Sequence, residues 1–138
     1  MLSRRKFFAG CALCAITGFA ATDASAQSSP PAATPGLTRK LLQQVDGPTP
    51  GYVTIVMEVT IDAGAKVARH THPGVESSYI IEGGGELIIE GQPNKPVKAG
   101  DGFQIPVGVI HALNNGDKPT KLAGTYIVEK GKPLASPA

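Results

Sequence analysis

The sequence has few aromatic residues and only two cysteines. Its 138 residues contain no tryptophan, four phenylalanines and three tyrosines, which argues against an aromatic platform for stacking nucleic-acid bases. The cysteines, Cys11 and Cys14, both lie near the start of the chain. No apolar run reaches the roughly 20 residues that a membrane-spanning helix needs. A long helical pattern is also missing, whereas 17 glycines and 12 prolines favour short strands joined by turns.

Residues 1–26 have the three parts of an export signal. The basic stretch 3–8 (SRRKFF) resembles a twin-arginine export motif, an uncharged apolar run follows, and residues 24–26 (ASA) match a small-residue cleavage site. We therefore predict that residues 1–26 are removed and that the protein is bacterial and periplasmic or secreted, with no stable membrane insertion after cleavage. A retained anchor or a buried helix is the alternative. Lipidation of Cys11 is disfavoured because it precedes most of the apolar run.

Removal of this signal changes the charge and the thiol content. Residues 1–26 contain both cysteines, three of the 13 basic residues and one of the 11 acidic residues, so residues 27–138 hold ten of each sign. The mature chain then has no disulfide and no thiolate ligand. It also has no excess of basic residues to neutralise phosphates, so a nucleic-acid partner is not expected.

The mature chain is predicted to contain one small all-β domain. Residues 27–36 form an uncharged Ser/Pro/Ala/Thr tract, predicted to be a flexible leader, and residues 132–138 are predicted to be a flexible tail. Between them, residues 37–131 hold several short strand patterns, which predict a sandwich or barrel. The clearest pattern is residues 53–61, where apolar residues alternate with mostly polar ones. Glycines 83–85 are expected to form a hairpin turn.

The three histidines of the chain are the candidate chemical groups. His70 and His72 are two apart on a predicted strand and therefore point to one face. Glu76 follows after a Pro-Gly break, and His111 comes from a distant strand. A barrel could bring all four to one point, where imidazoles and a carboxylate suit a divalent transition metal. The alternative is three unrelated histidines.

Two ordered motifs together cover residues 64–115. They read Gly64-x5-His70-x-His72-x3-Glu76-x6-Gly83 and Gly100-x5-Pro106-x-Gly108-x2-His111-x3-Asn115. Both resemble the motifs of the cupin superfamily, in which oxygenases, isomerases, lyases and decarboxylases all occur. The resemblance implies a single double-stranded β-helix, or jelly-roll barrel, with His70, His72, Glu76 and His111 as metal ligands.

These residues predict a metal-centred function on a small organic ligand. The expected cofactor is one divalent ion, with Mn or Fe favoured because export after folding would allow loading in the cytoplasm; Zn or Ni are the alternatives. A metal-dependent oxygenase, isomerase or lyase is the main hypothesis, with Glu76 as the candidate base. A non-catalytic binding or sensing module is the alternative. A homodimer is expected, with Tyr79 and Ile81 on an outer face. The candidate pocket residues are Met57, Ser78, Gln104 and Tyr126.

Overall fold

The protein folds into two five-stranded sheets. The structure is a computed structural model that describes residues 34–138. The predicted export signal and residues 27–33 of the predicted leader lie outside the described residues. Within residues 34–138 no helix is long and apolar enough to cross a membrane. The strands are β1 (Leu37–Asp46), β2 (Tyr52–Ile61), β3 (Lys66–Thr71), β4 (Gly74–Glu82), β5 (Gly84–Ile89), β6 (Lys95–Lys98), β7 (Gly102–Ile105), β8 (His111–Asn115), β9 (Thr120–Glu129) and β10 (Ser136–Pro137).

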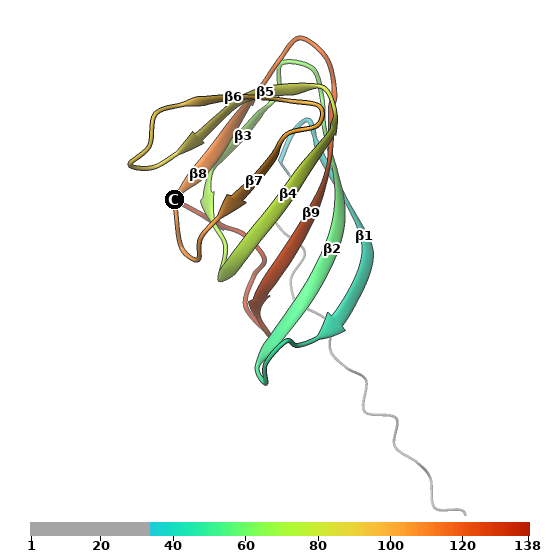
Figure 1. Cartoon of the computed structure of the whole chain (residues 1–138), viewed down its shortest axis with the longest axis vertical. Helices are drawn as coiled ribbons and strands as arrows, with labels where there is room; N and C mark the ends of the chain where they lie inside the picture. The colour runs from blue at the N-terminus through green and yellow to red at the C-terminus, as the bar shows by residue number, and fades with distance from the viewer. Residues whose placement is uncertain (1–33) are drawn as a thin grey trace, which may run out of the picture.

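The two sheets have the strand arrangement of a jelly roll. The first has the order β1-β2-β9-β4-β7 and the second the order β10-β3-β8-β5-β6 (Figure 1). All strand pairs in both sheets are antiparallel. Together with the motif spacing, this architecture confirms the predicted all-β jelly-roll fold.

The core lies between the sheets and is built largely by alternate residues of β2 and β9. In β2, every second residue from Val53 to Ile61 is buried, as the alternation of the sequence predicted. Leu122 and Val128 of β9 lie in the same cluster. The second sheet contributes apolar side chains that include Leu87 of β5 and Leu113 of β8. Because no disulfide is present in this core, its stability depends on apolar packing.

The glycines at 83–85 do not form the expected hairpin. β4 and β5 follow each other in sequence but belong to different sheets, so the chain crosses between sheets at Gly83. Gly83 has a φ of +77°, and a Cβ atom there would lie 2.3 Å from the carbonyl oxygen of Pro119. A glycine is therefore required by both the backbone conformation and the space.

The predicted domain begins at residue 37, where β1 also begins, but its C-terminal end needs correction. Strand β1 was not recognised, because it is a partly exposed strand at the sheet edge and a register shift between Leu41 and Gln43 interrupts its alternation. The predicted tail at 132–138 contains β10, which pairs with β3, and Leu134, which is 3% exposed. The folded domain therefore extends beyond residue 131.

Asn115 ties together three segments of the chain. Its side-chain nitrogen donates to the carbonyl oxygens of Ile61, Asp62 and Lys118 at 3.2, 2.7 and 3.0 Å. Its side-chain oxygen accepts a hydrogen bond from the Thr120 hydroxyl at 2.6 Å. This connection fixes the end of β8, the strand that begins at His111.

Candidate metal centre

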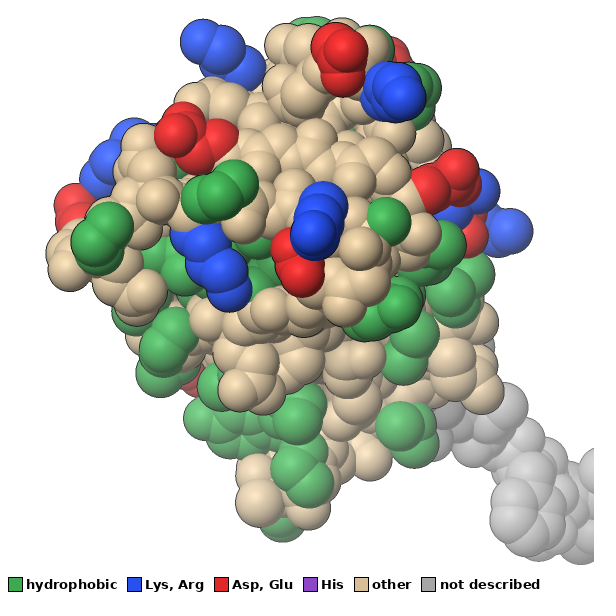
Figure 2. Space-filling view, turned by 45° about the horizontal axis from the view of Figure 1, so that its top comes forward, with side chains coloured by type: hydrophobic (Ala, Val, Ile, Leu, Met, Phe, Trp, Pro, Cys, Tyr) green, Lys and Arg blue, Asp and Glu red, His purple; other side chains and the backbone are tan. Residues whose placement is uncertain are grey.

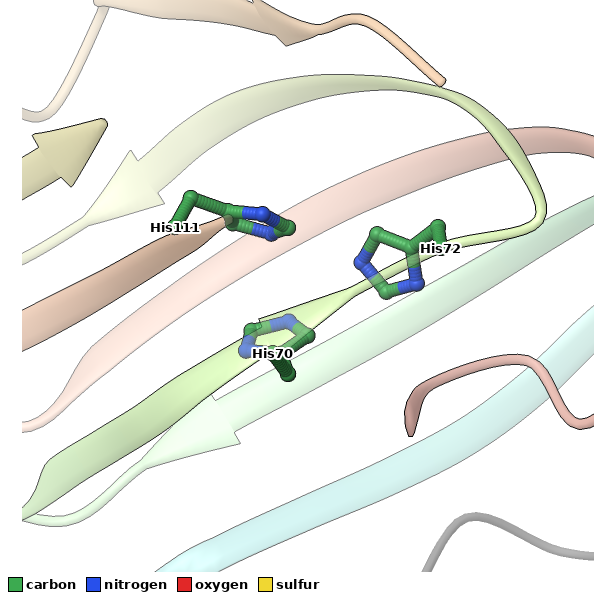
Figure 3. Close-up of side chains that lie close together, drawn as sticks. All are labelled: His70, His72 and His111. Atoms are coloured by element: carbon green, nitrogen blue, oxygen red, sulfur yellow. The ribbon is translucent and has the colours of Figure 1, made fainter. Parts of the chain in front are cut away.

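Three histidines converge between the sheets. His70 in β3 and His111 in β8 are direct partners in the register of the two strands, and His72 lies just after β3. The ring centroids are 4.1 Å apart for His70 and His111, 4.9 Å for His70 and His72, and 5.1 Å for His72 and His111. One nitrogen from each ring lies within 4.8 Å of the others (Figure 3). The three could therefore bind one metal ion together.

Hydrogen bonds to the backbone orient all three imidazoles. A carbonyl oxygen can only accept, so each Nδ1 that contacts one must carry a hydrogen. In a neutral ring, Nε2 is then left with a lone pair for the cavity. The contacts are His70 Nδ1 to Ala68 O at 2.8 Å, His72 Nδ1 to Leu134 O at 2.6 Å and His111 Nδ1 to Val109 O at 3.0 Å.

The carboxylate of Glu76 faces two of these nitrogens. Its Oε2 lies 3.0 Å from Nε2 of His72 and 3.3 Å from Nε2 of His111. Because Nδ1 of each neutral ring carries the hydrogen, Nε2 has only a lone pair. The Nε2 atoms of His72 and His111 are both buried, and neither has a hydrogen-bond partner among the described residues. Lone pairs and a carboxylate oxygen in this arrangement need a cation between them, either a proton or a metal ion. Three imidazole nitrogens and one carboxylate oxygen fit a divalent transition metal.

The ionisation states support cation binding near neutral pH. Burial, followed by the charge of His111, lowers the pKa of His70 to about 4, so its ring is neutral. Burial alone would raise the pKa of Glu76, but the adjacent imidazoles of His111 and His72 outweigh it and hold the pKa below its usual range. Burial, and then the charge of Glu76, raise the pKa of Tyr126, which therefore keeps its proton.

A second layer of contacts holds Glu76 in place. Ser78, two residues along β4 and on the same face, donates from its hydroxyl to Oε1 of Glu76 at 2.6 Å. The Tyr126 hydroxyl lies 3.4 Å from the same oxygen, and its strand position pairs with Glu76. The two carboxylate oxygens thus have different surroundings: Oε1 accepts hydrogen bonds, and Oε2 faces the histidines.

The cavity beside these groups has a volume of about 50 Å³. Its walls are mostly apolar and come from both sheets. Of the predicted pocket residues, Tyr126 lines it and Ser78 lies behind Glu76. Met57 does not line it but is part of the core, at 7% exposure. Gln104 is exposed and donates to the Ser77 hydroxyl, so its expected place in the pocket is corrected to the outer face.

Sequence reasoning missed two contributors to the site. Arg39 of β1 lines the cavity, and the carbonyl oxygen of Leu134 orients His72. Both lie in segments that the sequence did not predict as strands. The apolar residue at 134, in a segment that was read as a flexible tail, was the one available signal.

Comparisons with known proteins agree with this architecture. The family model described as "Cupin domain" matches residues 57–129. A search among curated proteins gave no match.

Several solved structures are similar. The DMSP lyase DddQ from Ruegeria pomeroyi is 29% identical over 53% of this chain and 37% of that protein, with a TM-score of 0.51. An RmlC-like cupin from Shewanella frigidimarina is 25% identical over 67% of this chain and 76% of that one, with a TM-score of 0.54. A salicylate 1,2-dioxygenase from Pseudaminobacter salicylatoxidans is 22% identical over 72% and 28%, with a TM-score of 0.57. The chain thus spans about a third of the lyase and less of the dioxygenase.

Proposed function

Because this chain belongs to the cupin domain family, whose pattern matches residues 57–129, we propose that it is an exported metal-dependent enzyme acting on a small organic substrate. The reaction class is that of an oxygenase or of an isomerase or lyase. Similar structures that include a DMSP lyase and a salicylate 1,2-dioxygenase support both classes. The observation that carries the proposal is the set of lone pairs from three histidines and Glu76, which converge in a buried cavity.

His70, His72, Glu76 and His111 would hold the ion. A bound divalent metal supplies Lewis acidity, a lowered pKa of bound water, or oxygen activation. The chain itself supplies orientation and proton control. The backbone bonds at each Nδ1 fix the imidazoles, and Ser78 fixes the carboxylate. Glu76 is ionised and buried, so it is the group placed to take a proton from a ligand in the cavity.

We infer Mn or Fe as the native ion, with Zn or Ni as alternatives. The donor set contains nitrogen and oxygen but no sulfur, and such a set does not select among these metals by itself. Copper and zinc bind more tightly at an open site of this kind, so loading before export would favour the weaker-binding ions.

A non-catalytic binding or sensing module is the second candidate. Such a module needs no free acid–base group beside the ion. Apart from the four proposed metal ligands and Arg39, Tyr126 is the acid–base group among the described residues that line the cavity. Its raised pKa keeps it protonated, which makes it a poor base.

The export signal predicts a periplasmic or secreted protein, and we propose that location. A fractionation experiment on the full chain tests it: Arg4→Lys together with Arg5→Lys is expected to hold the protein in the cytoplasm. Normal export of this double variant would contradict a twin-arginine route.

We also propose a homodimer. Val75, Tyr79, Ile81 and Ile127 are 38%, 53%, 45% and 37% exposed on β4 and β9, neighbours in the first sheet. Figure 2 shows hydrophobic side chains gathered on one part of the surface, with charged side chains of both signs on another. Sedimentation of the wild-type protein and of Tyr79→Glu tests this, and a monomeric wild type would refute it.

Metal analysis of the exported protein tests the main proposal. Mass spectrometry of protein isolated from its native host is expected to find about one Mn or Fe per chain. His72→Ala and His111→Ala should each lose most of the metal, whereas Lys40→Ala, on an outward position of β1, should keep it. Full occupancy in the His111→Ala protein would overturn the ligand set, and tightly bound Zn or Cu alone would overturn the choice of Mn or Fe.

A further inference from the structure

Arg39 lies where the metal cavity meets a neighbouring groove. It comes from β1, where its side chain is half-buried and Lys40, the next residue, is exposed. Arg39 lines the cavity together with the three histidines and Glu76. It also lines a groove of about 90 Å³, whose other walls include Thr34 and Ser136. A molecule that enters the cavity from this groove therefore passes the guanidinium group.

Arg39 and Arg69 are the two arginines among residues 34–138, and of these two Arg39 is the one without an ion-pair partner in that range. Arg69 pairs with Glu90 at 2.8 Å, and Lys130 pairs with Asp46 at 2.6 Å. Between residues 34 and 138, no side chain or backbone group is hydrogen-bonded to the guanidinium of Arg39, and no carboxylate lies within 4.0 Å of it. A half-buried guanidinium with five unused donors favours an anionic partner that can bind in a bidentate way.

The charges in the cavity point in the same direction. Among residues 34–138, Glu76 is the carboxylate that lines the cavity, and its two oxygens already face Ser78 and the histidines. A divalent ion with neutral histidines, ionised Glu76 and Arg39 would leave an excess of two positive charges. In a cavity with mostly apolar walls this excess favours a negatively charged ligand over a neutral one of equal shape.

We propose that Arg39 binds the carboxylate of the substrate or ligand, and that the site therefore takes small organic acids with a short apolar portion. This inference rests on the proposed function, because it places the ligand beside the metal centre. The carboxylate contacts the guanidinium at the junction with the groove. The apolar portion contacts side chains such as Phe103 and Leu122 in the cavity wall.

Matched pairs of probes test the proposal. Straight-chain carboxylates from acetate to pentanoate are compared with their amides, which have the same shape but no charge. Binding is measured by saturation-transfer NMR on Zn(II)-loaded and metal-free protein, and metal content is measured separately. The wild type should bind at least one carboxylate about tenfold more tightly than its amide, which corresponds to about 1.4 kcal/mol.

Three variants make the test specific. Arg39→Gln should abolish the preference for the carboxylate, and Arg39→Lys should keep part of it because the charge remains while the bidentate geometry is lost. Lys40→Gln changes net charge equally on the outward side of β1 and should behave like the wild type. Equal loss of carboxylate and amide binding in Arg39→Gln, or no carboxylate preference in the wild type, would overturn the proposal.

The outcomes also separate this inference from the proposed function. A wild type that binds no metal refutes the metal centre, yet an Arg39-dependent carboxylate preference in that protein still supports the role of Arg39. A wild type that binds metal without such a preference keeps the metal centre and refutes the role of Arg39.

Discussion

Removal of residues 134–138 should weaken metal binding more than its effect on folding explains. The carbonyl oxygen of Leu134 accepts the hydrogen bond from Nδ1 of His72 at 2.6 Å, 62 residues away in sequence. The truncation therefore removes both a buried leucine side chain and the group that fixes the orientation of His72. Loss of such a partner behind a histidine ligand typically costs about 10–100-fold in metal affinity.

A matched variant separates the two effects. Leu134 is 3% exposed, so Leu134→Ala should cost about 2–5 kcal/mol of unfolding free energy through lost packing. It keeps the backbone carbonyl, and its metal affinity should stay close to that of the wild type. The truncated protein loses this packing as well as the pairing of β10 with β3. Its metal affinity should be about 10–100-fold lower than that of Leu134→Ala.

Two measurements decide the matter. Urea denaturation gives the stability of each metal-free protein, and competition with a chromophoric chelator gives its metal affinity at a temperature where all three are folded. If the truncated protein and Leu134→Ala bind the metal equally well, the carbonyl does not position His72, and the reasoning is refuted.

Three further predictions concern single side chains. Ser78→Ala removes the buried hydrogen bond to Glu76 and should cost about 1–3 kcal/mol in urea denaturation, with weaker metal binding by chelator competition. Lowering the pH from about 6.5 to about 4 should progressively destabilise the metal-free protein in urea titrations, because the lowered pKa of His70 means that the unfolded chain binds more protons there. Gly83→Ala should cost about 2–5 kcal/mol in thermal unfolding, through a left-handed φ and a clash with backbone.

Each of these three has a control. Ser77→Ala, one residue away on the outer face, should change metal binding little; an effect as large as that of Ser78→Ala would reverse the assignment of faces. His70→Gln should flatten the pH dependence of stability between about 6.5 and about 4. If the slope stays the same in this variant, His70 is not the source of the pH dependence. Gly91→Ala has a similar φ but open space around it, so it should cost less than Gly83→Ala.

Local patterns predicted most of the fold. The alternation in β2 marks a strand with one buried face, and the structure buries those residues. The inward direction of Ser78 and the outward direction of Tyr79 also follow from the two-residue period, and both are confirmed. A strand with one face on the core leaves this pattern in its sequence because each residue type matches its environment.

The segments without such a pattern were missed. Strand β1 lies at a sheet edge and is largely exposed, so polar and apolar residues do not alternate cleanly along it. Strand β10 has only two residues, too few to show a period. Arg39 was missed because it lies in β1. The role of Leu134, which precedes β10, was missed because a backbone carbonyl leaves no trace in the side-chain pattern.

The site shows the same division. The sequence motifs predicted the four residues that lie together in the cavity, His70, His72, Glu76 and His111. Their spacing in the sequence follows from the order of the strands. They did not distinguish core from cavity, so Met57 was expected in the pocket and lies in the core. Gln104 shares a register position with Ser77, and pairing across β4 and β7 was needed to place it on the outer face. Such cross-strand information is not local in sequence.

The position of Asn115 also affects the chemical ageing of the protein. Gly116 follows it, and in Asn-Gly sequences the glycine nitrogen readily attacks the side-chain carbonyl carbon, which leads to deamidation. In the folded protein that nitrogen donates to the carbonyl of Gly84 at 3.0 Å, and the departing amide is held by three carbonyl oxygens. Deamidation at this residue therefore proceeds chiefly through unfolded molecules. The carboxylate that it produces would face those same carbonyls, so each damaged molecule unfolds more readily than an intact one.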